Sequence, residues 1–150
     1  MLPLTPSQTV GPFFAILVPA RGRATLVTDH TAGPRIVVEG SVRDGVGHPV
    51  PDALVEIWQA NAAGHCNHPE DARTHGPDPT FDGFGRVHTD ADGRFALETI
   101  KPGRVPGPGE QPQAPHLVIG LFARGLLARL VTRIYFDDEA TNAQDPVLLR

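Results

Sequence analysis

Apolar and polar residues alternate with a period of two through much of the chain, and clusters of turn residues separate the alternating runs. Val55 and Ile57 flank Glu56 in one such run, at residues 53–59. A period of two with β-branched and aromatic side chains favours a strand over a helix. The same pattern predicts strands at residues 35–42, 95–100 and 117–122, and a further strand-like run precedes the turn at Asp90.

Two turn signals connect these runs. Asp44-Gly45, followed by Gly47, lies between residues 35–42 and 53–59, so these two strands are predicted to form a hairpin-like unit. Asp90 and Gly93 precede the run at 95–100, where an acidic side chain caps the local backbone and glycine tolerates positive φ.

The C-terminal part continues the strand pattern. Residues 126–136 contain Val131, Ile134 and other residues of low helix preference in alternation with Arg129 and Arg133, so a strand is predicted there. Residues 123–125 form the turn before it, and residues 137–143 are expected to make a short helix. With long Gly/Pro-rich loops at 61–84 and 102–115, the pattern predicts an all-β sandwich.

The N-terminal segment differs from the rest. Residues 2–19 carry four prolines, which remove backbone donors and favour extended geometry, so an extended arm without a helix is expected. Four large apolar residues predict that the arm docks on a surface: Phe13, Phe14, Ile16 and Leu17. Residues 20–34 are predicted to be a polar connector. The chain is therefore divided into an arm and connector, 1–34, and a sandwich core, 35–150.

Composition narrows the functional classes. The 150 residues carry a formal net charge of −4 and no basic stripe, which gives no support to nucleic-acid binding. The single cysteine fits a reducing compartment. Because no apolar run reaches membrane-spanning length and no signal peptide is evident, we expect a cytoplasmic protein without a membrane partner.

Several motifs occur in an order that resembles the intradiol ring-cleavage dioxygenases. They are Trp58-Gln59-Ala60-Asn61, Gly85-Arg86 with Thr89-Asp90 and Gly93, Thr99-Ile100-Lys101-Pro102-Gly103, and Ala114-Pro115-His116. Within that family the chain resembles the alpha subunits of the members that act on protocatechuate, through residues 5–13, Phe122-Ala123-Arg124-Gly125 and Tyr135-Phe136-Asp137-Asp138. The resemblance implies the family's β-sandwich, with further strands after Arg150 that this sequence lacks.

The resemblance also implies where iron would be held. In this family two tyrosines and two histidines bind a ferric ion, and their positions fall here on Cys66, Val105, His116 and Val118. Valine cannot bind a metal, so the chain is expected to hold no iron, to be inactive in isolation, and to work in a hetero-oligomer whose beta subunit holds Fe(III). An arginine that helps to manage the catecholate falls on Gln113.

The expected contribution of the chain is to an active site shared with beta. The resemblance implies that the arm and one turn arginine reach that site, through Thr9, Val10, Gly11, Pro12, Phe13 and Arg124. The implied reaction is ring opening of protocatechuate by O2 to β-carboxy-cis,cis-muconate, a step of aromatic compound catabolism in the β-ketoadipate pathway.

Three other interpretations are less consistent with the sequence. A non-enzymatic transthyretin-like binding or structural module would share the Gly- and Pro-punctuated strand pattern, but it would not need the arm or the Phe-Ala-Arg-Gly turn. A zinc site from His65, Cys66, His68 and His75 matches no standard spacing. A calcium loop beginning at Asp90 would place Lys101 where a bidentate acid is required, which favours a plain turn.

Overall fold

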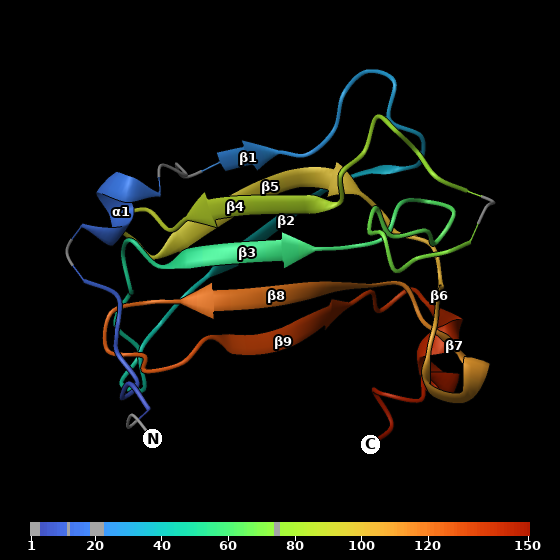
Figure 1. Ribbon diagram of the computed structural model, residues 1–150. Coiled ribbons are helices and arrows are strands. Elements are labelled where there is room, and N and C mark those ends of the chain that lie inside the picture. The colour runs from blue at the N-terminus through green and yellow to red at the C-terminus, as the bar shows by residue number, and fades with distance from the viewer. Residues whose placement is uncertain (1–3, 12, 19–22, 74–75) are drawn as a thin grey trace.

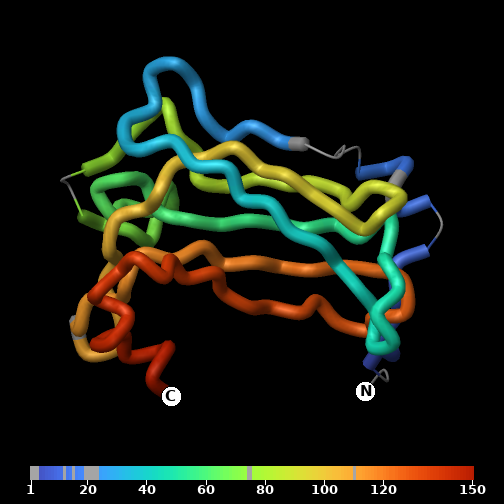
Figure 2. Tube along the Cα trace, turned by 180° about the vertical axis from the view of Figure 1, so that it is seen from behind, coloured from blue at the N-terminus to red at the C-terminus, as the bar shows by residue number. Residues whose placement is uncertain are grey.

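The computed structural model describes residues 4–11, 13–18, 23–73 and 76–150. Two sheets pack face to face, with long loops gathered at one end and the N-terminal arm at the other (Figure 1). Figure 2 shows from behind that the arm and the C-terminal segment lie at opposite ends of this sandwich. The predicted all-β sandwich is thereby confirmed.

The first sheet has three strands in the order β1-β5-β2. β1 (Arg23–Thr25) runs parallel to β5 (Arg94–Ile100), and β2 (Arg35–Ser41) runs antiparallel to β5 over its full seven residues. The partly buried side chains of β2 alternate with exposed ones, so this sheet turns one face to the core and one to solvent.

The second sheet has four antiparallel strands in the order β4-β3-β8-β9. They are β4 (Phe84–His88), β3 (Leu54–Trp58), β8 (His116–Phe122) and β9 (Leu130–Tyr135). Their inward side chains meet those of the first sheet in a core of Val55, Ile57, Val87, Leu97, Leu117 and Ile119. Because strand side chains alternate, Glu56 and Trp58 point to the opposite, outer face.

The predicted hairpin between residues 35–42 and 53–59 is wrong. β2 belongs to the first sheet and β3 to the second. The turn residues do close locally, since Arg43 bridges Pro49, but the chain then crosses from one sheet to the other. Pairing with β5, which matches β2 residue for residue, replaces the local hairpin.

Two expectations about the N-terminal segment also need correction. The arm contains a one-turn helix, α1 (Phe14–Leu17), although it was expected to be extended throughout. The connector contains β1, whose backbone gains partners along β5 that a polar loop would not have. Three prolines of the predicted arm, Pro3, Pro12 and Pro19, lie outside the described residues.

The remaining corrections concern boundaries. The loop at 102–115 contains a small hairpin of β6 (Val105–Pro106) and β7 (Pro112–Gln113), joined by a 3-10 helix at Pro108–Glu110. The last strand begins at Leu130, four residues later than predicted. The predicted short helix is a 3-10 helix at Ala140–Gln144.

None of the described helices is long and apolar enough to cross a membrane.

Candidate functional site: a cleft on the outer face of the four-stranded sheet

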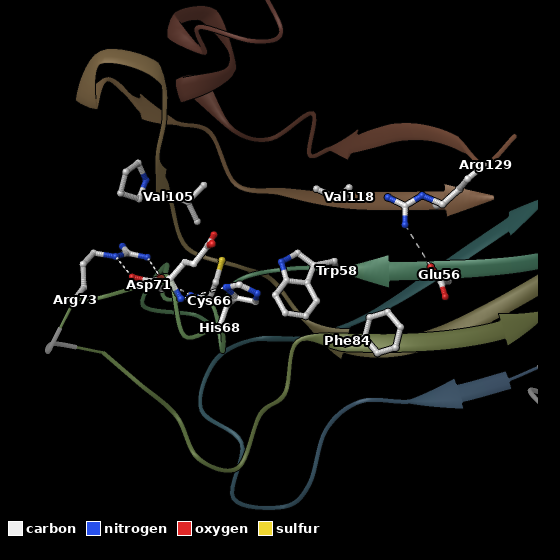
Figure 3. Close-up of a pocket in the computed structure, with 13 residues that line it drawn as sticks. Glu56, Trp58, Cys66, His68, Asp71, Arg73, Phe84, Val105, Val118 and Arg129 are labelled. Atoms are coloured by element: carbon white, nitrogen blue, oxygen red, sulfur yellow. Dashed lines mark hydrogen bonds and ion pairs between the residues drawn. The ribbon is translucent and has the colours of Figure 1, made fainter. Parts of the chain in front are cut away.

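The outer face of the four-stranded sheet forms the floor of a cleft of about 700 Å³ (Figure 3). The strand register places Trp58 between Phe84 and Val118, and Glu56 between Arg86 and Gly120. The loop 61–83 and the β6–β7 hairpin supply the other walls. The lining residues are Glu56, Trp58, Cys66, His68, Glu70, Asp71, Arg73, Phe84, Val105, Pro106, Val118, Gly120 and Arg129.

Three of the four predicted ligand positions line this cleft. Cys66 comes from the long loop, Val105 from β6 and Val118 from β8, so segments far apart in sequence converge on one place. The fourth, His116, is not among the lining residues. Gln113, in β7 of the small hairpin, is buried, and its side-chain amide donates to the Pro106 carbonyl at 2.7 Å.

The thiol of Cys66 lies in a setting that keeps it protonated. Burial is the main cause that raises its pKa, and the negative charge of Asp71 adds to the effect. A hydrogen bond with the Trp58 side chain acts in the opposite direction. Asp71 itself pairs with Arg73, whose hydrogen bonds hold the pKa of that carboxyl well below its usual range.

His116 belongs to a buried polar network instead. Its Nδ1–H donates to the Ala114 carbonyl at 2.8 Å, and its ring lies 5.5 Å from that of Tyr135. The carboxylate of Asp145, which is fully buried, accepts from the backbone N–H of Ala114 at 2.7 Å and from the N–H of Val147 at 2.8 Å. This network fastens the C-terminal segment to the start of β8.

The residues in the cleft do not fit a ferric ion. Intradiol dioxygenases depend on ferric iron, a hard cation that prefers phenolate and imidazole ligands. Two of the predicted positions are valines, and the pKa of the one thiol is raised. Among the described residues no group of three or more His, Cys, Asp or Glu side chains is arranged to hold a metal ion. His75, one of the four residues of the alternative zinc site, lies outside the described residues.

Sequence reasoning missed the charged floor of the cleft. Glu56 accepts a 2.9 Å hydrogen bond from Arg86 Nε, and Arg129 Nη1 lies 3.6 Å from its other oxygen. Alternation along β3 and β4 could have suggested the Glu56–Arg86 pair, since both residues have the outward phase. Nothing in the sequence places Arg129 over Gly120, because that position depends on the bend before β9.

The arm and the turn after β8 meet at the other end of the sandwich. The Thr9 hydroxyl accepts a 2.7 Å hydrogen bond from the Gly125 N–H and lies 3.5 Å from the Ala123 carbonyl. Arg124, between these two residues, is exposed. Thr9, one of the arm residues predicted to reach a shared site, thereby lies next to the turn that carries the predicted arginine, and Pro12 lies outside the described residues.

One of the four apolar arm residues docks on the chain itself. The Phe14 ring lies 5.9 Å from the ring of His88 and 6.4 Å from that of Phe122. Phe13, Ile16 and Leu17 remain exposed, at 68%, 70% and 77%. The predicted docking therefore holds for Phe14 within this chain, and the other three present apolar surface.

The cleft and the arm are distinct but close on the outer face of the four-stranded sheet: Arg129, which lines the cleft, lies 6.0 Å from the centre of the Phe122 ring, and the Phe14 ring of the arm lies 6.4 Å from that same ring. Along β8, Val118 in the cleft and Phe122 beside the arm are four residues apart, which corresponds to roughly 13 Å. Figure 1 shows β6 at one end of the sandwich and α1 at the other. Arg124 and the described arm residues are not among the residues that line the cleft of their own chain.

Comparisons with known proteins agree with this arrangement. A family model described as Dioxygenase matches residues 10–149. A protocatechuate 3,4-dioxygenase alpha chain from Pseudomonas putida is 42% identical over 99% of this chain and 77% of its own length. A protocatechuate 3,4-dioxygenase beta chain from Burkholderia cepacia is 47% identical over 77% of this chain, which spans half of that relative.

A solved structure supports the same assignment. The dioxygenase domain of a carbohydrate-binding fusion protein from Streptomyces sp. SirexAA-E superposes with a TM-score of 0.67. It is 32% identical, with coverage of 96% of this chain and 82% of that one. From the family match over nearly all residues and these relatives, the chain belongs to the intradiol ring-cleavage dioxygenases.

Proposed function

We propose that this chain is the alpha subunit of a protocatechuate 3,4-dioxygenase. It supports the opening of the protocatechuate ring by O2, to β-carboxy-cis,cis-muconate, at an active site shared with a beta subunit. The match to an alpha chain over 99% of the sequence supports this assignment. In this proposal beta holds the ferric ion, and the isolated chain is inactive.

The observation that carries the proposal is the replacement of ligands in the cleft. Val105 and Val118 line the place where a family member would hold its metal, and neither has a donor atom in its side chain. The similarity to a beta chain covers less of the sequence and does not restore a ligand set. A role in a complex is favoured over independent catalysis for this reason.

The arm end supplies the positive part of the proposal. Arg124 is exposed, and the Thr9–Gly125 hydrogen bond ties the arm to its turn. A guanidinium keeps its charge at any relevant pH and binds carboxylates bidentately, which suits the carboxylate of an aromatic acid. A ferric ion held by beta would activate the catechol, and Arg124 together with Thr9, Val10, Gly11, Pro12 and Phe13 would orient it from the alpha side.

Two further assignments belong to this proposal. Residues 1–34 act as the arm and connector, and residues 35–150 act as the core that presents them. The single cysteine supports a cytoplasmic location. The alternative of a non-enzymatic transthyretin-like module has no support among the relatives described above, because all of them are dioxygenases.

Co-expression with a beta subunit tests the proposal. We expect the two chains to co-purify by size, to take up O2 when protocatechuate is added, and to contain iron in proportion to beta. The chain alone should contain no stoichiometric iron and consume no O2. An isolated chain that holds about one iron and shows a visible tyrosinate absorption band would overturn the assignment, as would the failure of any beta subunit to associate.

A further inference from the structure

We propose that the cleft above Trp58 is a binding site for an aromatic carboxylate that needs no metal. The inference rests on the shape, aromatic lining and charge of the cleft, and it does not require that the chain assemble with a beta subunit. A volume of about 700 Å³ lies within the range of small-molecule pockets, which are mostly apolar and carry a few oriented polar groups. This cleft has both features.

Aromatic side chains lie in the middle of the cleft. The Trp58 ring lies 6.2 Å from the Phe84 ring, at an interplanar angle of 51°, and 6.2 Å from the His68 ring, at 84°. Figure 3 shows these three side chains around the centre of the cleft. Phe84 is 39% exposed, so it offers a ring face to a ligand. Offset or edge-to-face contacts with a second aromatic ring are favourable at these spacings.

Arg129 supplies a cation toward one end of the cleft. Gly120 lets its side chain lie across the sheet, because a Cβ at that position would come within 3.2 Å of Arg129 Cδ. Its guanidinium also lies 6.0 Å from the centre of the Phe122 ring. These contacts keep the Arg129 side chain flat along the floor of the cleft, so it does not extend into solvent.

The charge of Arg129 is only partly neutralised. Glu56 bonds Arg86 at 2.9 Å, whereas Arg129 is 3.6 Å from Glu56, beyond a normal hydrogen bond. Two guanidinium groups therefore share one carboxylate, and Arg129 has donors left for another anion. The carboxylate of a ligand would complete this set, whereas a cation would meet a Glu56 that already has two partners.

The second arginine of the cleft is already engaged. Arg73 pairs with Asp71 and donates to the Gly64 carbonyl at 2.8 Å. Glu70, nearby, is exposed and negative, which disfavours an anion at the loop end of the cleft. The ligand is therefore oriented with its ring against Trp58 and Phe84 and its carboxylate toward Arg129.

Trp58 is the only tryptophan in the chain and provides a local probe. The full chain, alone or assembled with an unlabelled partner, is labelled with 5-fluorotryptophan, so that its 19F spectrum contains one protein signal. Benzoate, benzamide and cyclohexanecarboxylate are titrated as an anionic aromatic, an uncharged aromatic and a non-aromatic anion. Binding of benzoate at the partner's own site would not move this signal, because the signal reports the cleft.

Benzoate is expected to shift the Trp58 signal saturably and to bind more tightly than either comparison compound. Arg129→Gln should weaken benzoate about tenfold, as for one lost charge-assisted contact, and leave benzamide unchanged. Arg94→Gln, an exposed arginine of the other sheet, is the matched control and should change neither. Val118→Phe should block all three compounds by filling the cleft. No saturable shift with benzoate, or equal benzoate affinity in Arg129→Gln, would overturn the inference.

Discussion

The Gly125 N–H donates a 2.7 Å hydrogen bond to the hydroxyl of Thr9, which lies 116 residues earlier in the chain. This contact joins an N-terminal arm to the turn that carries Arg124. The same hydroxyl lies 3.5 Å from the Ala123 carbonyl, so it spans both sides of the arginine. The arm thereby fixes the turn, and the turn fixes the arm.

The first prediction concerns this contact. Thr9→Val keeps the shape of the side chain but removes the acceptor, so the Gly125 amide should exchange its hydrogen with solvent faster. The loss should be on the order of 0.5 to 1.5 kcal/mol, as for a typical hydrogen bond. Thr9→Ser retains the hydroxyl and should retain the protection. Amide hydrogen exchange at Gly125 is measured by mass spectrometry or NMR. Equal exchange rates in Thr9→Val and the wild type would show that the contact does not hold the turn.

A second prediction concerns a buried link between the two sheets. The Thr99 hydroxyl, on β5, donates to Gln59 Oε1 at 2.7 Å, just after β3, and Gln59 Nε2 donates to the Ile100 carbonyl at 3.0 Å. Both side chains are almost completely buried. Thr99→Val leaves the Gln59 oxygen without its donor and should lower the free energy of unfolding by about 1 to 3 kcal/mol.

A matched control for this prediction is Thr25→Val. Thr25 is exposed, and its hydroxyl makes a longer bond of 3.4 Å to Glu98. Its loss should change the free energy of unfolding by less than about 0.5 kcal/mol, as expected for a surface substitution. Denaturant unfolding followed by circular dichroism measures both variants. Similar decreases in the free energy of unfolding for Thr99→Val and Thr25→Val would show that the Thr99–Gln59 hydrogen bond does not stabilise the contact between the sheets.

A third prediction concerns pH. Burial lowers the pKa of His116, and the nearby charge of Arg133 lowers it further. Burial alone would raise the pKa of Asp145, but hydrogen bonds from the N–H groups of Leu148, Val147 and Ala114 outweigh it and lower that pKa. In both cases the unfolded chain binds more protons than the folded one as pH falls, so acid destabilises the fold.

The pH range follows from the ordinary pKa values. The free energy of unfolding should be level between about pH 7 and 8, decline below about pH 6.5 as unfolded His116 gains a proton, and decline further below about pH 4 through Asp145. His116→Gln should flatten the first decline and leave the second. Unfolding titrations at a series of pH values measure this, and a fold that becomes more stable between pH 7 and 5 would contradict it.

Local patterns were sufficient for much of the fold. β3 and β8 appear within one residue of the predicted boundaries, because their period of two comes from one buried face. The turn at Asp90 is present as predicted, with the Asp90 carboxylate accepting from the Arg94 N–H at 2.8 Å and Gly93 at a φ of 72°. These features depend only on residues near to one another in the chain.

Features that depend on distant contacts were not predictable. The pairing of β2 with β5 was missed because a turn signal at Asp44 is equally compatible with a hairpin and with a crossing between sheets. The Gly93 carbonyl accepts from the Val42 N–H at 2.8 Å, a contact that helps to hold this crossing. Arg129 over Gly120 is likewise a product of the three-dimensional arrangement.

Arg124 provides the most direct test of the claim that this chain serves a partner's active site. In the complex with beta, Arg124→Ala should lower kcat/KM for protocatechuate, because a charge-assisted contact is lost. The decrease should correspond to a loss of about 1 to 3 kcal/mol of transition-state stabilisation. Arg124→Lys should recover only part, because lysine keeps the charge without the planar fork. The size of the complex and its iron content should not change.

Steady-state O2 uptake by the intact complex, with Arg150→Ala as a second exposed arginine for comparison, is the decisive measurement. The account predicts a lower kcat/KM in Arg124→Ala and wild-type constants in Arg150→Ala. Wild-type kcat and KM in Arg124→Ala, in a complex of unchanged size and iron content, would contradict it and leave the chain as a scaffold only.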